Sequence, residues 1–199
     1  MATGHTHLHH LRYRRISGIC NRFTPKASVT IPRNVIISRH MHIHLVLNNL
    51  RSVYNTGSLF RTADAAGVVH IHLVGTTPTP TDRFGRVRKD FHKTALGAEE
   101  VVPWTYHETF EECAEHLRQF GVIMVALEQD ETSITYNKIP IDQSLALVVG
   151  NEPEGFSEED LLLCDFVAEI PQYGEKESLN VAVAAGVALF DLARRTNEL

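Results

Sequence analysis

Short apolar runs alternate with segments of helical character through most of this chain, and no other feature restricts the fold as strongly. The apolar runs predict strands at His42–Leu47, His70–Val74, Val122–Leu127, Leu145–Val149 and Val167–Ile170, with a further short strand at Glu100–Val102. Predicted helices occupy Asn55–Ala66, Glu108–Phe120, Ser157–Leu163 and Ser178–Arg195. Such alternation is typical of an α/β domain built on a mainly parallel sheet flanked by helices.

Three polar loops follow predicted strands, at the edge of a parallel sheet where ligands bind. They read TPTPTDRFGRVRK, GNEPEG and IPQYGEKES. The chain contains no GxGxxG and no GxxxxGK[ST], so the usual dinucleotide and P-loop sites lack their phosphate cradle. A GxSxG motif is also absent, which argues against a serine hydrolase of the α/β type.

Composition favours one globular domain in a reducing compartment. The chain has 199 residues, of which 43% are hydrophobic, and no apolar run approaches a membrane span of roughly 18 residues. Its three cysteines, Cys20, Cys113 and Cys164, lie far apart without CxxC spacing, which argues against a disulfide framework or a zinc site. We therefore expect a cytoplasmic protein that needs no metal.

Charge divides the chain at about residue 40. Residues 1–40 hold seven Lys and Arg and no acid, whereas the remainder holds all 24 acidic residues. A basic, acid-free lead is typical of a transit peptide or a nucleic-acid-binding arm, and Met41 directly before HIHLVL also permits a mis-set translation start. We interpret residues 1–40 as a disordered or non-native extension and residues 41–199 as the domain. An organellar location is the alternative if the extension is a transit peptide.

The segment YNTGSLFRTADAAG places Arg61 among very small residues. Asn55 suits a helix N-cap, and Arg61 shares a helix face with Gly57 and Asp64. This nearly bare face would let another backbone or a phosphate come close. A surface Arg61–Asp64 ion pair explains the spacing equally well.

GNEPEGFSEED follows the apolar run LALVV. Gly150 permits a close approach where the strand meets its loop, and Glu152 precedes Pro153, which biases it to an extended conformation at the strand end. A carboxylate there could bind hydroxyl or amine groups of a ligand. An acidic turn before a helix capped by Ser157 is the simpler interpretation of this segment alone.

Ser178 and Asn180 open a last helix that is apolar on every face. Such a helix must be buried all round, inside the domain or against a partner chain, and an identical subunit is the economical choice for a domain of this size. An N-cap role explains Ser178 but not Asn180, whose side chain is able to hold ligand or backbone groups.

The loop DRFGRVRK and the residues after it combine cations with aromatic rings. Phe84 and Phe91 lie among the cations Arg83, Arg86, Arg88, Lys89 and Lys93. Positive charge with exposed rings suits RNA, whose phosphates supply affinity and whose unstacked bases lie on rings. A solvated loop is the alternative.

These blocks in this order resemble the SpoU–TrmH branch of the SPOUT superfamily, RNA ribose 2′-O-methyltransferases with a deep C-terminal trefoil knot. The resemblance runs from about Met41 to Arg195 and rests on three motifs: Asn55-x-Gly-x-x-x-Arg61, Val149-Gly150-Asn151-Glu152-Pro153-Glu154-Gly155, and Ile170-Pro171 followed by Ser178-Leu179-Asn180-Val181. Thr79-Pro80 and the KTALGAE block, residues 93–99, resemble one group within the family.

The resemblance implies S-adenosylmethionine as methyl donor, an RNA substrate and a homodimer packed through the last helix. It implies cofactor contacts at Gly150, Asn151, Ile170, Gln172 and Leu179. Arg61 corresponds to the family's catalytic arginine, and its fellow motif residues are Asn55, Glu152, Ser178 and Asn180. Because arginine stays protonated, we expect Arg61 to clamp a phosphate rather than act as the base. We expect tRNA as substrate, with rRNA, or a catalytically idle RNA-binding dimer, as alternatives.

Overall fold

The computed structural model describes residues 41–150 and 155–197. The predicted extension, residues 1–40, lies outside the described residues, and so do Asn151 and Glu152 of the second motif.

The core of the fold is a seven-stranded sheet in which every neighbouring pair of strands is parallel. The strand order is β3-β2-β1-β6-β4-β7-β5. The strands are β1 Ile43–Asn48, β2 His70–Val74, β3 Trp104–His107, β4 Ile123–Leu127, β5 Ile134–Thr135, β6 Leu145–Gly150 and β7 Phe166–Glu169. The α/β fold class predicted from the alternation is confirmed. The trefoil knot stays a prediction.

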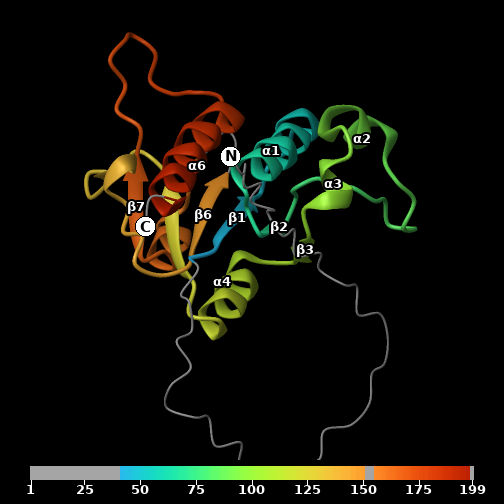
Figure 1. Cartoon of the computed structure of the whole chain (residues 1–199), viewed down its shortest axis with the longest axis horizontal. Helices are drawn as coiled ribbons and strands as arrows, with labels where there is room; N and C mark the ends of the chain where they lie inside the picture. The colour runs from blue at the N-terminus through green and yellow to red at the C-terminus, as the bar shows by residue number, and fades with distance from the viewer. Residues whose placement is uncertain (1–40, 151–154, 198–199) are drawn as a thin grey trace, which may run out of the picture. The chain divides into compact units, whose positions relative to one another are not determined.

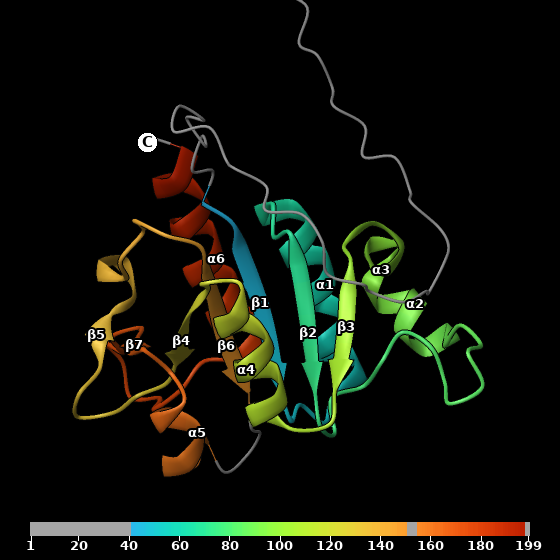
Figure 2. The same ribbon diagram turned by 90° about the horizontal axis from the view of Figure 1, so that it is seen from below.

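Helices cover both faces of the sheet (Figures 1 and 2). One layer contains α1 (Val53–Ala66), α2 (Lys89–Ala95), α3 (Ala98–Val101) and α6 (Val181–Asn197), whereas α4 (Phe110–Gln119) and α5 (Glu158–Leu162) lie on the other side; a 3-10 turn, η1, spans Tyr136–Lys138. We call these the α1/α6 layer and the α4 layer. Each layer has its own buried apolar cluster.

Alternation along the strands supplies both clusters. Leu45 and Leu47 of β1 pack under the α1/α6 layer, while Val46 packs under α4. Central strands of a parallel sheet are buried on both faces, which is why they read as nearly continuous apolar runs.

Most predicted elements are confirmed to within a few residues, but the strand predicted at Glu100–Val102 is wrong. Gly97, with φ 91°, precedes the short helix α3, and Pro103 follows it. The neighbouring strand is Trp104–His107, which pairs with β2. The β-branched pair Val101-Val102 favours a strand by local propensity, but Val101 ends helix α3 and the edge strand starts only at Trp104. The long basic loop is also shorter than expected, since α2 begins at Lys89.

The last helix is buried on one side only. Ala185, Ala188, Leu189 and Leu192 are buried, whereas Val183, Val187 and Phe190 are 52%, 38% and 52% exposed. Burial inside the domain, one of the two options, is therefore excluded, and burial of the exposed face against a partner chain stays a prediction. An apolar stripe remains at positions 183, 187 and 190, which share one helix face.

No helix among the described residues is long and apolar enough to cross a membrane. Cys113 and Cys164 are free thiols. Burial raises the pKa of each to about 12, so both remain protonated near neutral pH.

Candidate active site

A cavity of about 510 Å³ opens at the carboxyl ends of three neighbouring strands. Its walls come from the residues that follow β4, from the end of β6, from the residues that follow β7, and from the start of α6. Leu127, Val149 and Val181 make part of the wall apolar, while Glu128 and Glu169 add carboxylates. The cavity therefore combines an apolar bed with negative charge.

The β4 side of this cavity was missed by sequence reasoning. Glu128 and Gln129 directly follow β4, and both line the cavity. The Gln129 side chain donates to the carbonyl of Glu177 at 2.6 Å, which ties the loop after β7 to the end of β4. The available signal was position, because polar residues after a buried parallel strand lie at the ligand-binding edge.

Of the five predicted cofactor contacts, four line the cavity: Gly150, Ile170, Gln172 and Leu179. Gln172 donates its side-chain amide to the carbonyl of Ile170 at 2.7 Å. Among hydrogen bonds between described residues, the backbone N–H groups of Gln172 and Leu179 have no acceptor. These two donors are free to bind a ligand. Asn151, the fifth contact, lies outside the described part of the chain.

Gly150 is required by a close backbone approach. Its φ is +154°, and a Cβ at this position would overlap the carbonyl oxygen of Asn48 on the adjacent strand β1. Asn48 is itself fully buried and donates to Asp160 at 2.9 Å. Burial raises the pKa of Asp160, and the hydrogen bond from Asn48 partly opposes that rise.

The first and third motifs meet at the cavity rim. Asn180, which lines the cavity, donates its side-chain amide to the side-chain oxygen of Asn55 at 3.1 Å. Ser178 also lines the cavity. Residues 125 positions apart are thus joined, which the sequence order alone does not reveal.

The predicted capping roles change. Ser52, not Asn55, caps α1, because the Ser52 hydroxyl accepts from the backbone N–H of Asn55. Asn180, not Ser178, caps α6 by accepting from the backbone N–H of Ala182 at 3.0 Å. One Asn180 side chain therefore holds the helix start with its oxygen and Asn55 with its nitrogen.

Arg61 is exposed on α1 and does not line the cavity. Its side chain forms no hydrogen bond or ion pair with any other described residue, so the Arg61–Asp64 pair weighed from the spacing is not formed. Side chains on a helix lean toward its N-terminus, which for α1 is the cavity end of the sheet.

Gly57 allows α1 and α2 to pack closely together and does not leave an open surface. It is buried, and a Cβ there would lie 2.8 Å from the Cβ of Thr94 on α2. The sequence left two partners open for this bare face of α1, either another backbone or a phosphate. Near Gly57 the partner is another segment of the chain, the helix α2. The exposed part of the face lies at Arg61, Asp64 and Ala65.

The basic loop lies beyond α1, on the β3 side of the sheet, and is separate from the cavity (Figure 2). Arg83 and Arg86 lie 4.8 and 5.1 Å from the ring centre of Phe84. Arg86 also pairs with Asp82 at 2.7 Å, and Arg88 with Asp90 at 2.8 Å.

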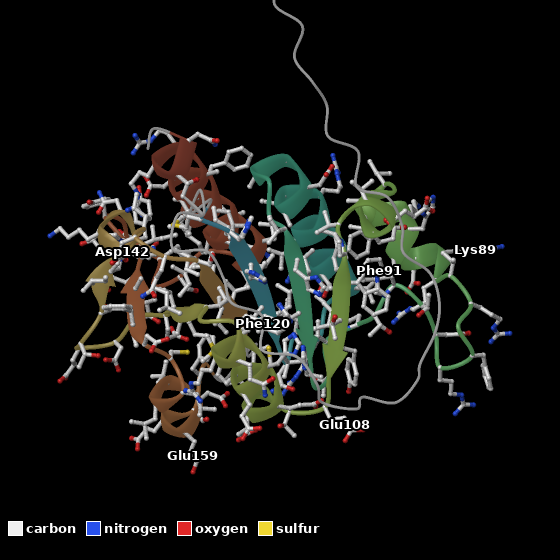
Figure 3. All side chains as sticks on the ribbon, turned by 60° about the horizontal axis from the view of Figure 1, so that its bottom comes forward. Lys89, Phe91, Glu108, Phe120, Asp142 and Glu159 are labelled. Atoms are coloured by element: carbon white, nitrogen blue, oxygen red, sulfur yellow. The ribbon has the colours of Figure 1, made fainter. Side chains whose placement is uncertain are left out.

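These pairs affect the acids of the loop. Backbone and side-chain hydrogen bonds from Arg86 lower the pKa of Asp82, and the side-chain bond from Arg88 lowers that of Asp90. The loop is therefore less positive than its five cations suggest. Lys89 and Lys93 are exposed, and Figure 3 shows Lys89 pointing away from the body of the protein.

Comparison with known proteins gives the site its context. Residues 42–190 match the model of the SpoU rRNA Methylase family. The 23S rRNA (guanosine-2'-O-)-methyltransferase RlmB of Pseudomonas aeruginosa is 32% identical over 78% of this chain and 60% of its own length. The tRNA (guanosine(18)-2'-O)-methyltransferase of Thermus thermophilus is 31% identical over 81% of this chain and 79% of its own length.

A solved structure agrees with both relatives. The AdoMet-bound rRNA methyltransferase from Sinorhizobium meliloti superposes with a TM-score of 0.67 at 30% identity, covering 77% of this chain and 56% of that one. The chain spans about 60% of the length of the RlmB relative. The matched region contains the described strands and all three motifs, and the chain belongs to the SpoU rRNA Methylase family.

Proposed function

We propose that this protein transfers a methyl group from S-adenosylmethionine to a ribose 2′-OH of RNA. The observation that carries the proposal is the bond between Asn180 and Asn55, which joins the first and third family motifs at the rim of the strand-end cavity. The relatives from P. aeruginosa and T. thermophilus, both named as guanosine 2′-O-methyltransferases, support the same chemistry.

The lining of the cavity suits the methyl donor in polarity and charge. Its apolar wall at Leu127, Val149 and Val181 offers a bed for an adenine ring, and the free N–H groups of Gln172 and Leu179 offer donors to ring nitrogens. Glu128 and Glu169 complement a positively charged ligand. When bound, S-adenosylmethionine supplies an electrophilic methyl group on a sulfonium centre. Because Gly150 has no side chain, a ligand in the cavity can come directly against its backbone.

Arg61 places the RNA in this proposal. It stands six residues after Asn55, about 9 Å further along α1, and its guanidinium has no partner among the described residues. A guanidinium is permanently charged at neutral pH and binds phosphate oxygens in a bidentate manner. Arg61 would hold the phosphate next to the reacting ribose and stabilise the negative charge that develops there. Glu152 and Ser178 are proposed as further polar contacts to the reacting groups.

The bound RNA would extend from the basic loop to the cavity. The end of β2, where the basic loop starts, and the end of β7 are four strand spacings apart, or about 20 Å. Arg61 lies between them, because α1 stands between α2 and α6 (Figure 1). The exposed cations at Arg83, Lys89 and Lys93 would bind phosphates, and Phe84, 66% exposed, would stack on a base. We propose tRNA as the substrate, and the T. thermophilus relative, which is named as a tRNA methyltransferase and is 31% identical, supports this choice.

A homodimer through α6 completes the proposal. The exposed stripe of Val183, Val187 and Phe190 is apolar, and the resemblance implies a dimer packed through this helix. Burying such a stripe against a second copy removes it from water at about 25 cal/mol per Å².

The role of Arg61 is tested with Arg61→Ala. We expect methyl transfer to bulk tRNA to fall about 100-fold or more, with S-adenosylmethionine binding and thermal stability unchanged. Calorimetry measures binding, and incorporation of labelled methyl groups measures transfer. Lys138→Ala, which removes an exposed cation whose ammonium group bonds to no other described residue, is the control and should retain activity.

Near-normal methylation by Arg61→Ala would refute the clamp. A wild-type protein that binds tRNA but not S-adenosylmethionine would instead indicate a catalytically idle RNA-binding protein. Transfer to rRNA fragments but not to tRNA would move the substrate to the rRNA class.

The dimer is tested with Val187→Glu. We expect light scattering to show a dimer for the wild type and a monomer for the variant, because the interface would have to bury a charge. Leu162→Glu, at a side chain that is 83% exposed on α5, is the control and should remain dimeric. A wild-type monomer, or a Val187→Glu dimer of unchanged affinity, would contradict the proposed interface.

A further inference from the structure

The α4 layer covers a group of metal-binding side chain types that the proposed methyl transfer does not use. Alternation along β1 to β3 places four histidines on this face of the sheet, and α4 adds a cysteine and a fifth histidine one turn apart. The residues are His44, His70, His72, His107, Cys113 and His116. Figure 3 shows nitrogen atoms gathered between α4 and these strands, near the labelled Phe120.

Three members of this group converge. His72, His107 and Cys113 are 2%, 3% and 0% exposed, and one donor atom from each lies within 4.8 Å of the other two. Nδ1 of His72 and Nε2 of His107 are only 3.1 Å apart. Ligand atoms around a tetrahedral zinc ion lie about 3.3–3.8 Å apart, given metal–ligand bonds of about 2.0–2.3 Å. The His72–His107 separation is thus near that range, and 4.8 Å is the upper limit for the two separations that involve Cys113.

A chain of neutral imidazoles is the competing explanation. His72 contacts His107 through one ring nitrogen and His44 through the other, at 3.3 Å, and a neutral ring can donate at one nitrogen and accept at the other. This chain accounts for the ring nitrogens but not for the thiol. Within residues 41–150 and 155–197, the Cys113 sulfur forms no hydrogen bond.

We propose that His72, His107 and Cys113 bind a divalent transition metal of the zinc class. The Cys113 thiol releases its proton to solvent as the sulfur–metal bond forms. Imidazole and thiolate together select zinc and cobalt over magnesium and calcium, which prefer oxygen ligands. His116 follows Cys113 by three residues on α4, and its ring centre lies 5.5 Å from that of His107, but it is outside the group whose donor atoms lie within 4.8 Å of one another. It would supply a fourth ligand only after its side chain moves closer.

The surroundings suit a structural ion. His44 contacts the second ring nitrogen of His72, and a metal-bound histidine usually has such an outer hydrogen-bond partner. Glu112, whose carboxylate acts on His107 electrostatically, offsets part of the positive charge that an ion and one thiolate would leave. The ligands come from β2, the end of β3 and α4, so the ion would fasten this helix to the sheet edge.

Cobalt is the probe for this site. Thiolate-bound Co²⁺ shows a sulfur-to-metal charge-transfer band that imidazole-only binding does not produce. This distinction is needed because His5, His7, His9 and His10 can also bind metal. We expect the full-length protein to develop the band with one Co²⁺ per chain and to lose it when Zn²⁺ is added.

Cysteine variants assign the band. Cys113→Ala should abolish it, whereas Cys20→Ser and Cys164→Ser, the matched controls, should keep it. Retention of the band in Cys113→Ala, or its absence from the wild-type protein, would overturn the proposal.

A second measurement keeps the test independent of how the variant folds. Zn²⁺ should raise the wild-type unfolding temperature relative to protein kept in a chelator, since an ion that binds only the folded state stabilises it. The same rise should occur in Cys20→Ser and Cys164→Ser. An unfolding temperature that is identical with Zn²⁺ and with chelator would contradict a site of this kind.

Discussion

The two sides of the sheet carry different chemistry, and the two groups of residues lie on different strands: the cavity at β4, β6 and β7, and the histidines on β1, β2 and β3. The α1/α6 layer covers an apolar cluster and borders the strand-end cavity, while the α4 layer covers the histidines and Cys113. Most residues of the cavity come from short continuous motifs, such as residues 178–181. The histidines come from three strands and a helix, and only the pleat and the strand order bring them together. A site built from continuous motifs is visible in the sequence, whereas a site built across strands is not.

The largest effect is expected on the cavity side, from Gly150→Ala. The added Cβ would overlap the backbone of Asn48 on a central strand, so we expect a loss of about 3 kcal/mol or more in the free energy of unfolding, together with loss of S-adenosylmethionine binding. Urea denaturation and calorimetry measure the two effects.

Gly174→Ala is the matched control for this prediction, because a Cβ there meets no atom within 4 Å. Wild-type stability and binding in Gly150→Ala would show that the strand ends tolerate separation, and that the cavity does not depend on this close approach.

An intermediate effect is expected on the histidine side, as a dependence of stability on pH in metal-free protein. Burial lowers the pKa of His44 to about 4 and that of His72 to about 2, with repulsion from neighbouring histidines adding to both shifts. The ordinary pKa is 6.5, so below that pH the unfolded chain takes up protons that the folded chain does not.

Stability should therefore be unaffected by these groups above pH 6.5 and should fall as the pH drops toward 4. The slope is about 1.4 kcal/mol per pH unit for each proton concerned. The groups that face His72 are His44, His70, His107 and His116, and Glu112 acts on His107. Urea denaturation between pH 7.5 and 4.5, with a chelator present, measures the slope.

His44→Gln should reduce that slope by about 1.4 kcal/mol per pH unit, the contribution of one proton. The variant therefore separates the contribution of His44 from that of the carboxylates. A variant whose slope equals that of the wild type would show that His44 is protonated equally in both states.

The smallest effect distinguishes tight from loose packing within the α1/α6 layer. Gly186→Ala should raise the free energy of unfolding by about 0.5–1 kcal/mol, because its Cβ would make ordinary contact with Thr62 at 3.6 Å and alanine favours a helix. Gly57→Ala should lower it by about 1–2 kcal/mol, because its Cβ would lie 2.8 Å from Thr94. Chemical denaturation measures both, and equal signs for the two variants would contradict the difference in packing.

Local sequence is sufficient to predict a helix or strand where residue propensity, apolar pattern and capping residues all indicate the same element. His70–Val74 combines β-branched residues with a position inside the sheet, between β1 and β3, and its predicted bounds agree with those observed. Ser157 was predicted as the cap of α5 and accepts from the backbone N–H of Asp160. Prediction failed at Glu100–Val102, where the positive φ of Gly97 and the position of Pro103 outweighed the strand propensity of two valines.

The sequence likewise predicts the residues of the candidate site that belong to motifs, or lie between the parts of one, and not the others. All the predicted site residues that line the cavity, apart from Gln172, belong to the three motifs: Gly150, Ile170, Ser178, Leu179 and Asn180. Gln172 lies in the loop between the two parts of the third motif. Glu128 and Gln129 belong to no motif, and they enter the site only because β4 lies between β6 and β7. The basic loop was recognised by charge, but its ion pairs with Asp82 and Asp90 depend on turn geometry that charge counting does not include.

The sequence by itself determined the α/β class, the parallel sheet, the family motifs and the apolar character of the last helix, because each is encoded in residues close together in the chain. Only the tertiary structure decided that Asn55 meets Asn180, that Gly57 is filled by α2, and that His72, His107 and Cys113 converge. These contacts depend on strand order and helix placement. Both result from burying apolar area over the whole domain rather than from any local pattern.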